Sequence, residues 1–252
     1  MNSNIVISRR QLIAGSASLT ASLAIAPTLT AATGGPIVVE LFTSQGCSSC
    51  PPADALLGDL LKRPNLIALT FNVDYWDYLG WRDTLASAEY SRRQRAYAQA
   101  RGDGQVYTPQ MVIIGQTHVV GSRRRAVDQG LSASAGTPVP MTMAEQGNEV
   151  IVEIAARPDG VPSGEATIWI AMVVPQIDVE IARGENTGRN ISYFNVARKL
   201  MPAGSWHGEA VRLTLPKNEL FVDGATACAA ILQSGGVGPI LGAAAYGDIH
   251  GA

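Results

Sequence analysis

The stretch VELFTSQGCSSCPP, residues 39–52, decides the fold of this chain. A short apolar run that is rich in β-branched residues ends in a polar loop, and two cysteines three positions apart, Cys47 and Cys50, follow that loop. The next residues carry leucine and alanine at helical spacing, and a proline suits the first helical turn because an N–H there has no intrahelical partner. The sequence therefore predicts a strand over 36–42 and a helix over 51–61, joined by the cysteine loop.

Further along the chain the periodicity first alternates between strand and helix and then becomes strand only. Up to residue 135 it predicts strands over 66–73, 110–114 and 117–120 and helices over 84–101 and 124–131. A linker rich in Pro and Gly follows at 136–140. Beyond it we predict strands over 149–155, 166–174, 177–182, 207–215 and 225–233. The sequence thus predicts an α/β domain over 34–135 and a β-rich, sandwich-like domain over 136–252.

The N-terminal residues 1–33 have the order of an export signal. Arg9 and Arg10 precede a mildly apolar run over 12–26, and small residues follow at 30–32. Paired arginines before such a run indicate a twin-arginine-like signal, and a Sec signal with two incidental arginines is the alternative. Both predict a periplasmic or secreted protein. The run is too short and too polar for a good membrane span, so no stable membrane insertion is expected after the signal is removed.

Composition and charge exclude some classes of protein. Of the 252 residues 46% are hydrophobic and 16% are charged, which is enough apolar material to build cores. The net charge of −2 gives no electrostatic reason to bind nucleic acid. The chain has three cysteines, so one has no partner within the chain. Cys228 lies in a small apolar run and is predicted to be that buried, unpaired thiol.

Two cysteines at the start of a helix can do redox chemistry. Helix N–H groups and the helix dipole stabilise a thiolate at the first cysteine, so Cys47 is predicted to be the exposed, acidic nucleophile. Cys50 is expected to be shielded and to resolve the mixed disulfide. The hydroxyls of Ser48 and Ser49 can donate to a thiolate, which would make the disulfide more oxidising. No second cysteine pair follows, so a zinc site is not expected.

Two segments of the chain resemble a known protein superfamily. Residues 39–50, together with the stretch YTPQMV at 107–112, resemble the active-site loop and the cis-proline loop of the thioredoxin superfamily. The resemblance covers residues 36–135. It implies that the Thr108–Pro109 bond is cis and lies beside the cysteines, with Pro109 organising the backbone on the substrate side and Thr108 pairing with an extended substrate.

The resemblance to thioredoxins suggests one of two possible roles for Glu40. It lies near the place where thioredoxins bury an acid that assists the second cysteine, so it is predicted to be either a proton carrier or a surface carboxylate. Thioredoxins have Trp before the pair and Gly-Pro within it, whereas this chain has Gly46 and two serines, so a strong reductant does not follow. With the stretch NVDYWDYLGWRD at 72–83, these features also resemble a poorly characterised family of exported bacterial thioredoxin-like proteins, labelled as a domain of unknown function.

The segment after the second predicted strand is rich in aromatic residues. Tyr75, Trp76, Tyr78 and Trp81 are expected at the cysteine end of the sheet, where they form either a substrate groove or a loop packed by its own aromatics. As substrate-binding residues we predict Thr108, Tyr75, Trp76 and Trp81. The nearby acids Asp74, Asp77 and Asp83 lack the EF-hand pattern, so a cation site there is the weaker alternative.

These observations favour a periplasmic thiol–disulfide oxidoreductase that uses Cys47 and Cys50, with Pro109 and Glu40 assisting. The expected partners are protein or small-molecule thiols and disulfides and an unidentified redox partner, with no cofactor and no metal. Two alternatives stay open. The first is a soft-metal carrier that binds Cu(I) through the two thiols, helped by Met111 or His118. The second is an interaction module with a static disulfide.

Overall fold

The computed structural model describes residues 34–249, so the predicted signal segment lies outside the described residues. In the first half the elements are β1 (Ile37–Thr43), α1 (Pro51–Leu60), β2 (Leu66–Asn72), a 3-10 turn (Asp77–Leu79), α2 (Ala88–Arg101), β3 (Gln110–Ile113), β4 (Thr117–Val120) and α3 (Arg124–Ser132). The second half comprises β5 (Met141–Gln146), β6 (Glu149–Ile154), β7 (Ala166–Glu180), β8 (Asn190–Trp206), β9 (Val211–Pro216), α4 (Lys217–Leu220), β10 (Ala227–Ser234) and β11 (Ile240–Tyr246). None of the helices in this range is long and apolar enough to cross a membrane.

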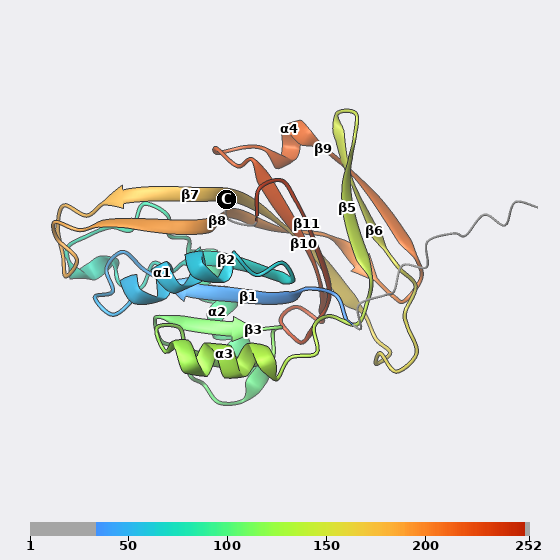
Figure 1. Cartoon of the computed structure of the whole chain (residues 1–252), viewed down its shortest axis with the longest axis horizontal. Coiled ribbons are helices and arrows are strands. Elements are labelled where there is room, and N and C mark those ends of the chain that lie inside the picture. The colour runs from blue at the N-terminus through green and yellow to red at the C-terminus, as the bar shows by residue number, and fades with distance from the viewer. Residues whose placement is uncertain (1–33, 250–252) are drawn as a thin grey trace, which may run out of the picture. The chain divides into compact units, whose positions relative to one another are not determined.

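An eight-stranded sheet forms most of the molecule, in the order β11-β10-β7-β8-β2-β1-β3-β4. The strands β1 and β2 are parallel, whereas β3 and β4 are antiparallel to their neighbours. Nearly every residue of β1 and β2 is buried, because helices cover both faces of these strands. The chain is therefore a mixed α/β protein with a large body of sheet (Figure 1).

The alternation of side chains along β1 assigns the helices to the two faces. Val39 and Leu41 pack with residues of α1 and α3. Val38 and Phe42 point the other way and pack with Tyr90 and Tyr97 of α2. Because successive side chains of a strand point to opposite faces, the face of every β1 residue follows from these four contacts. We call the two sides of the sheet the α1 face and the α2 face.

The predicted boundary at residue 136 does not separate two bodies. The described residues 34–249 lie within one compact unit, and β8 joins the sheet directly beside β2 through a bridge between Thr70 and Val196. The Thr70 hydroxyl also donates to the Phe194 carbonyl at 2.6 Å. The core on the α2 face contains residues from both halves of the chain. The strands beyond the linker thus extend the first sheet, instead of building a separate sandwich.

A second, smaller sheet covers part of this extension. It has three antiparallel strands in the order β5-β6-β9. Apolar residues of this sheet pack on β7, β8 and β10 and enclose Cys228, which is completely buried and unpaired, as predicted. Burial raises the pKa of the Cys228 thiol to about 12, so this thiol is inert at neutral pH.

One buried ion pair ties the two halves together on the α2 face. Arg93 of α2 donates to Glu40 of β1 at 2.7 Å, and both side chains are buried. The same guanidinium donates to Gln233 of β10 at 2.8 Å and lies over the ring of Trp169 of β7. Tyr97 completes the cluster with a hydrogen bond to the Glu40 carboxylate. Removing one charge would therefore leave the other buried and unpaired.

We expect Arg93→Ala to lower the free energy of unfolding by about 3–5 kcal/mol, since breaking a buried pair leaves an uncompensated charge. The measurement is urea unfolding at pH 7 followed by circular dichroism. The matched control is Arg92→Ala on the same helix, where an exposed pair with Glu89 is lost and a change below about 1 kcal/mol is expected. Equal effects of the two substitutions would contradict the role given to Arg93.

Candidate functional site

Cys47 and Cys50 form a disulfide between the end of β1 and the start of α1, with their Cα atoms 5.4 Å apart. Cys50 is the N-cap residue of α1, and Pro51 and Pro52 occupy its first two positions. The sequence predicted an exposed Cys47 and a shielded Cys50. The first half of this prediction is wrong, because Cys47 is only 3% exposed and Cys50 is 0% exposed. Gly46 lies against Trp76, and Ser48 and Ser49 form the exposed rim of the loop.

Few backbone donors are free to reach the Cys47 sulfur. Pro51 and Pro52 have no N–H, and the Cys50 N–H donates to the Cys47 carbonyl at 3.1 Å. The Ser48 N–H points to the carboxylate of Glu185 at 3.3 Å. Two groups of Ser49 remain: its hydroxyl, with the oxygen 3.4 Å from the Cys47 sulfur, and its backbone N–H, which has no acceptor among the described residues. The thiolate stabilisation that the sequence predicted from helix N–H groups thus has fewer donors than a helix start ordinarily offers.

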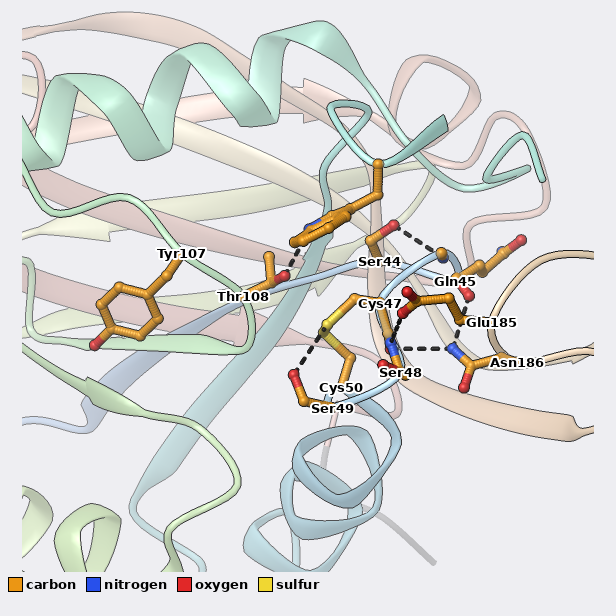
Figure 2. Close-up of a disulfide and its surroundings, with 12 residues drawn as sticks. Ser44, Gln45, Cys47, Ser48, Ser49, Cys50, Tyr107, Thr108, Glu185 and Asn186 are labelled. Carbon is orange, nitrogen blue, oxygen red and sulfur yellow. Dashed lines mark hydrogen bonds between the residues drawn. A yellow bond between two sulfur atoms is a disulfide. The ribbon is translucent and has the colours of Figure 1, made fainter. Parts of the chain in front are cut away.

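The loop that joins β7 to β8 lies directly on the disulfide loop (Figure 2). Asn186 is buried and donates its amide to the carbonyls of Gln45 at 2.9 Å and Cys47 at 3.0 Å. These partners are 141 and 139 residues away along the chain. The sequence shows only a polar turn at this place, because contacts between a side chain and a distant backbone leave no local pattern. We call residues 181–189 the clasp.

The predicted substrate-binding residues divide into two groups. Trp76 donates its indole N–H to the Thr108 hydroxyl at 2.7 Å, and Figure 2 shows Thr108 beside the disulfide. The Thr108–Pro109 bond is cis, as predicted. Tyr75 and Trp81 have structural partners instead, since Tyr75 donates to Gln94 at 3.1 Å and Trp81 donates to Gln45 at 2.8 Å. The structure thus shows contacts of these aromatic residues within the protein, and their binding of a substrate stays a prediction.

Two exposed apolar side chains stand out on the described surface. Tyr78 is 78% exposed and stacks on Trp76, and Val106 is 36% exposed and lies three residues before Pro109. Tyr78 lies in the loop after β2 and Val106 in the loop before β3. The hydrogen bond between Trp76 and Thr108 joins these two loops beside the disulfide. A partner that binds over the disulfide would therefore meet apolar surface on this side.

Glu40 is not a surface carboxylate, and nothing in its contacts tests the predicted role as a proton carrier. Its carboxylate is completely buried on the α2 face, where Arg93 neutralises it. The helix α1, which begins at Cys50, packs on the α1 face instead. The sequence places Glu40 close to the cysteine loop but does not reveal on which face of the sheet its side chain lies, because that depends on how the sheet is covered.

The buried acid on the cysteine side is Asp54, which lies in the first turn of α1. Asp54 is 2% exposed, and its backbone N–H donates to the Cys50 carbonyl at 3.2 Å. Neither of its carboxylate oxygens has a well-formed hydrogen bond within the described part of the chain. Burial raises the pKa of Asp54 well above its ordinary value, the Thr43 hydroxyl opposes this shift, and the Asp83 carboxylate adds to it.

A second buried acid accompanies Asp54. Asp83 accepts hydrogen bonds from the Gln45 N–H at 2.8 Å and from Asn72 at 3.0 Å, and burial raises its pKa. The buried hydroxyl of Tyr193 has no partner among the described residues, and both acids act on it electrostatically. Two carboxyl groups that interact at a buried site cannot both ionise at low cost, so each raises the free energy of ionising the other.

A cleft of about 810 Å³ adjoins this site. One wall is α1 with the turn that follows it, from Pro51 through Gly58 to Lys62, and the other is the β7–β8 hairpin with Ser192 and Phe194. The cleft reaches Pro51, the residue that follows Cys50. Its walls mix apolar side chains with amide and charged groups, as is usual for binding clefts.

Residues 38–233 match the model of a family described as a protein of unknown function (DUF1223). The crystal structure of a structural-genomics target from Agrobacterium tumefaciens is 33% identical in sequence, with a TM-score of 0.73, over 84% of this chain and 94% of that chain. HBP35 of Porphyromonas gingivalis has a TM-score of 0.56 at 10% identity, over 84% and 75% of the two chains, which is a likeness of fold alone. Among curated proteins, none matches this chain.

The raised pKa of Asp54 predicts a pH-dependent effect of Asp54→Asn on stability. The folded state of the wild type resists ionisation of this group, so the wild type loses stability as pH rises from the unfolded-state pKa towards the folded-state pKa. The variant avoids this loss. We expect similar unfolding free energies near pH 4 and a variant that is more stable than the wild type at pH 8.

The matched control for this urea titration is Asp59→Asn on the same helix. Asp59 is exposed, and its hydrogen bond with Arg124 lowers its pKa, so its replacement should not stabilise the protein at pH 8. A pH-independent difference between Asp54→Asn and the wild type would show that Asp54 ionises in the fold as it does in water.

Proposed function

Because the chain belongs to the DUF1223 family, whose description names no activity, we propose a function from its own site: it is a thiol–disulfide oxidoreductase that acts through Cys47 and Cys50. The observation that carries the proposal is the disulfide at the junction of β1 and α1, with Thr108 beside it. A pair of cysteines at a βα junction is the usual setting of a redox pair. The proposed substrates are thiols and disulfides of proteins or small molecules.

The proposed exchange runs through one mixed disulfide. With the pair reduced, the Cys47 thiolate attacks one sulfur of the substrate disulfide, and the other substrate sulfur leaves as a thiolate that takes up a proton. Cys50 then loses its proton and attacks the Cys47 sulfur. The bond between Cys47 and the substrate breaks, so the substrate leaves reduced and the protein disulfide forms. A redox partner restores the dithiol, and the same steps in reverse oxidise a substrate.

In this mechanism Asp54 takes the proton-carrying role that the sequence suggested for Glu40. Cys50 is fully shielded, so its proton needs an acceptor inside the protein. Asp54 follows it by one helical turn, on the face where α1 packs, and is held close by the hydrogen bond to the Cys50 carbonyl. A carboxyl group with a raised pKa can accept a proton from a thiol and return it when the direction reverses.

A thioredoxin-like frame and an exported location belong to the same proposal. The order β1-α1-β2-α2-β3-β4-α3, with the strands arranged β2-β1-β3-β4, supports a thioredoxin-like first half. The paired Arg9 and Arg10 before an apolar run support export by a twin-arginine-like signal. Outside the cytoplasm the pair would meet an oxidising environment, in which a dithiol needs a partner to stay reduced.

One observation favours a second candidate, a static disulfide in an interaction module. Cys47 and Cys50 are only 3% and 0% exposed, which limits attack by a substrate thiol. The soft-metal alternative has less support. Met111 is completely buried in the core of the α1 face, and His118 is engaged by Tyr107 at 2.8 Å and Asp103 at 3.0 Å. Neither is a free ligand.

An insulin-reduction assay with dithiothreitol, run beside reoxidation of a reduced protein substrate, tests the function. We expect the wild type to accelerate at least one reaction, Cys47→Ser to abolish the effect, and Cys50→Ser to accumulate mixed disulfides that mass spectrometry can map. Cys228→Ser is the matched control and should retain full activity. A Cys47–Cys50 bond that resists dithiothreitol and exchanges with no substrate would establish the static candidate instead.

A further inference from the structure

The clasp brings a negative charge to the cysteine loop. Its Glu185 carboxylate accepts the Ser48 N–H at 3.3 Å, directly beside Cys47 (Figure 2). In a loop where two prolines already remove donors, this N–H is one of few groups that could otherwise face a thiolate at Cys47. Glu185 therefore acts twice: it occupies a donor and adds a like charge near the sulfur, and both effects disfavour the charged form.

Glu185 is itself exposed, but its neighbours hold the clasp backbone that carries it. Asn186 is 1% exposed and clamps the carbonyls of Gln45 and Cys47, so the clasp cannot leave the loop without stranding buried polar groups. Gly184, at φ +81°, lies so close to Trp81 that a Cβ there would be 3.1 Å from the Trp81 Cβ. Trp81 in turn donates to Gln45. The clasp is thus packed against the loop on two sides.

We infer that Glu185 is a positioning residue that sets the redox equilibrium of the Cys47–Cys50 pair, holding it towards the disulfide. The inference rests on the proposed function in one respect, because it requires that the Cys47–Cys50 disulfide can be reduced. The equilibrium concerned is protein disulfide plus two glutathione molecules giving protein dithiol plus glutathione disulfide, in which two electrons and two protons pass to the protein. Reduction creates the Cys47 thiol, and the Glu185 carboxylate opposes its ionisation to the reactive thiolate.

The experiment compares Glu185→Gln with the wild type in redox buffers of glutathione or dithiothreitol at pH 7 and 50 mM salt. Glutamine still accepts the Ser48 N–H but carries no charge. We expect the equilibrium constant for reduction to rise three- to tenfold, where tenfold corresponds to about 30 mV for a two-electron couple. The populations are read by quenching with an alkylating agent and mass spectrometry. In the Cys50→Ser background, Cys47 should also alkylate faster at pH 6 when Glu185 is replaced.

Salt separates a charge effect from a structural one. At 1 M salt the Debye length falls to about 3 Å from about 10 Å at 0.1 M, so the difference between wild type and Glu185→Gln should shrink at least by half. Glu180→Gln is the matched control: it removes an exposed carboxylate from the same hairpin, at the end of β7, and should change the equilibrium less than twofold. Circular dichroism verifies that each variant is folded.

Three results would overturn the inference. The first is an equilibrium constant for reduction of Glu185→Gln that lies within twofold of the wild-type constant. The second is an equal change of this constant in Glu180→Gln. The third is a difference between Glu185→Gln and the wild type that 1 M salt leaves unchanged. The test requires no turnover, so it is independent of the insulin assay. If the protein catalyses neither reaction but the equilibrium constant changes, the inference holds and the proposed function is wrong. If the protein is catalytic but the constant does not change, the proposed function holds and the inference is wrong.

Discussion

The carbonyls of Gln45 and Cys47 present the constraint on which the rest of the structure depends. They lie just beyond the end of β1, where no strand partner is available, and a buried carbonyl without a donor destabilises the fold. The Asn186 amide donates to both of them, and for the Gln45 carbonyl it is the donor, whereas the Cys47 carbonyl also accepts the Cys50 N–H. To bring that amide into place, β7 and β8 must run past the edge of β2, and the clasp must close over the cysteine loop. The geometry of the disulfide is therefore a property of the whole sheet.

The buried acids Glu40 and Asp54 differ in whether a positive charge neutralises them. On the α2 face Arg93 meets Glu40, and the resulting pair stabilises the contact between the halves of the chain. Near the cysteines Asp54 is buried, its carboxylate has no hydrogen-bond partner of good geometry among the described residues, and desolvation raises its pKa. A neutralised acid suits a structural joint, whereas an acid with a raised pKa suits a site where protons move. This contrast separates the two carboxyl groups more clearly than their positions in the sequence do.

Local patterns in the sequence predicted the local features well. The β1–α1 junction, the cysteine pair, the cis bond before Pro109 and the burial of Cys228 all follow from residues close together in the chain. The strand β8 escaped detection because Pro202 and Gly204 interrupt its pattern, and the structure accommodates them at an irregularity in the pairing with β7. Asn186 and Glu185 escaped for another reason, since their partners are some 140 residues away and the alignment of the two segments exists only in three dimensions.

The long separation between β2 and β8 also bears on how quickly the protein folds. In the sheet β8 inserts between β7 and β2, so the first half of the chain cannot complete its edge until residues near 196 have been synthesised and have returned to it. Proteins dominated by such non-local pairings fold slowly, because loop-closure entropy is lost before the contacts form. Until that late step the edge of β2 stays open to other chains, which makes nascent or truncated forms prone to aggregation.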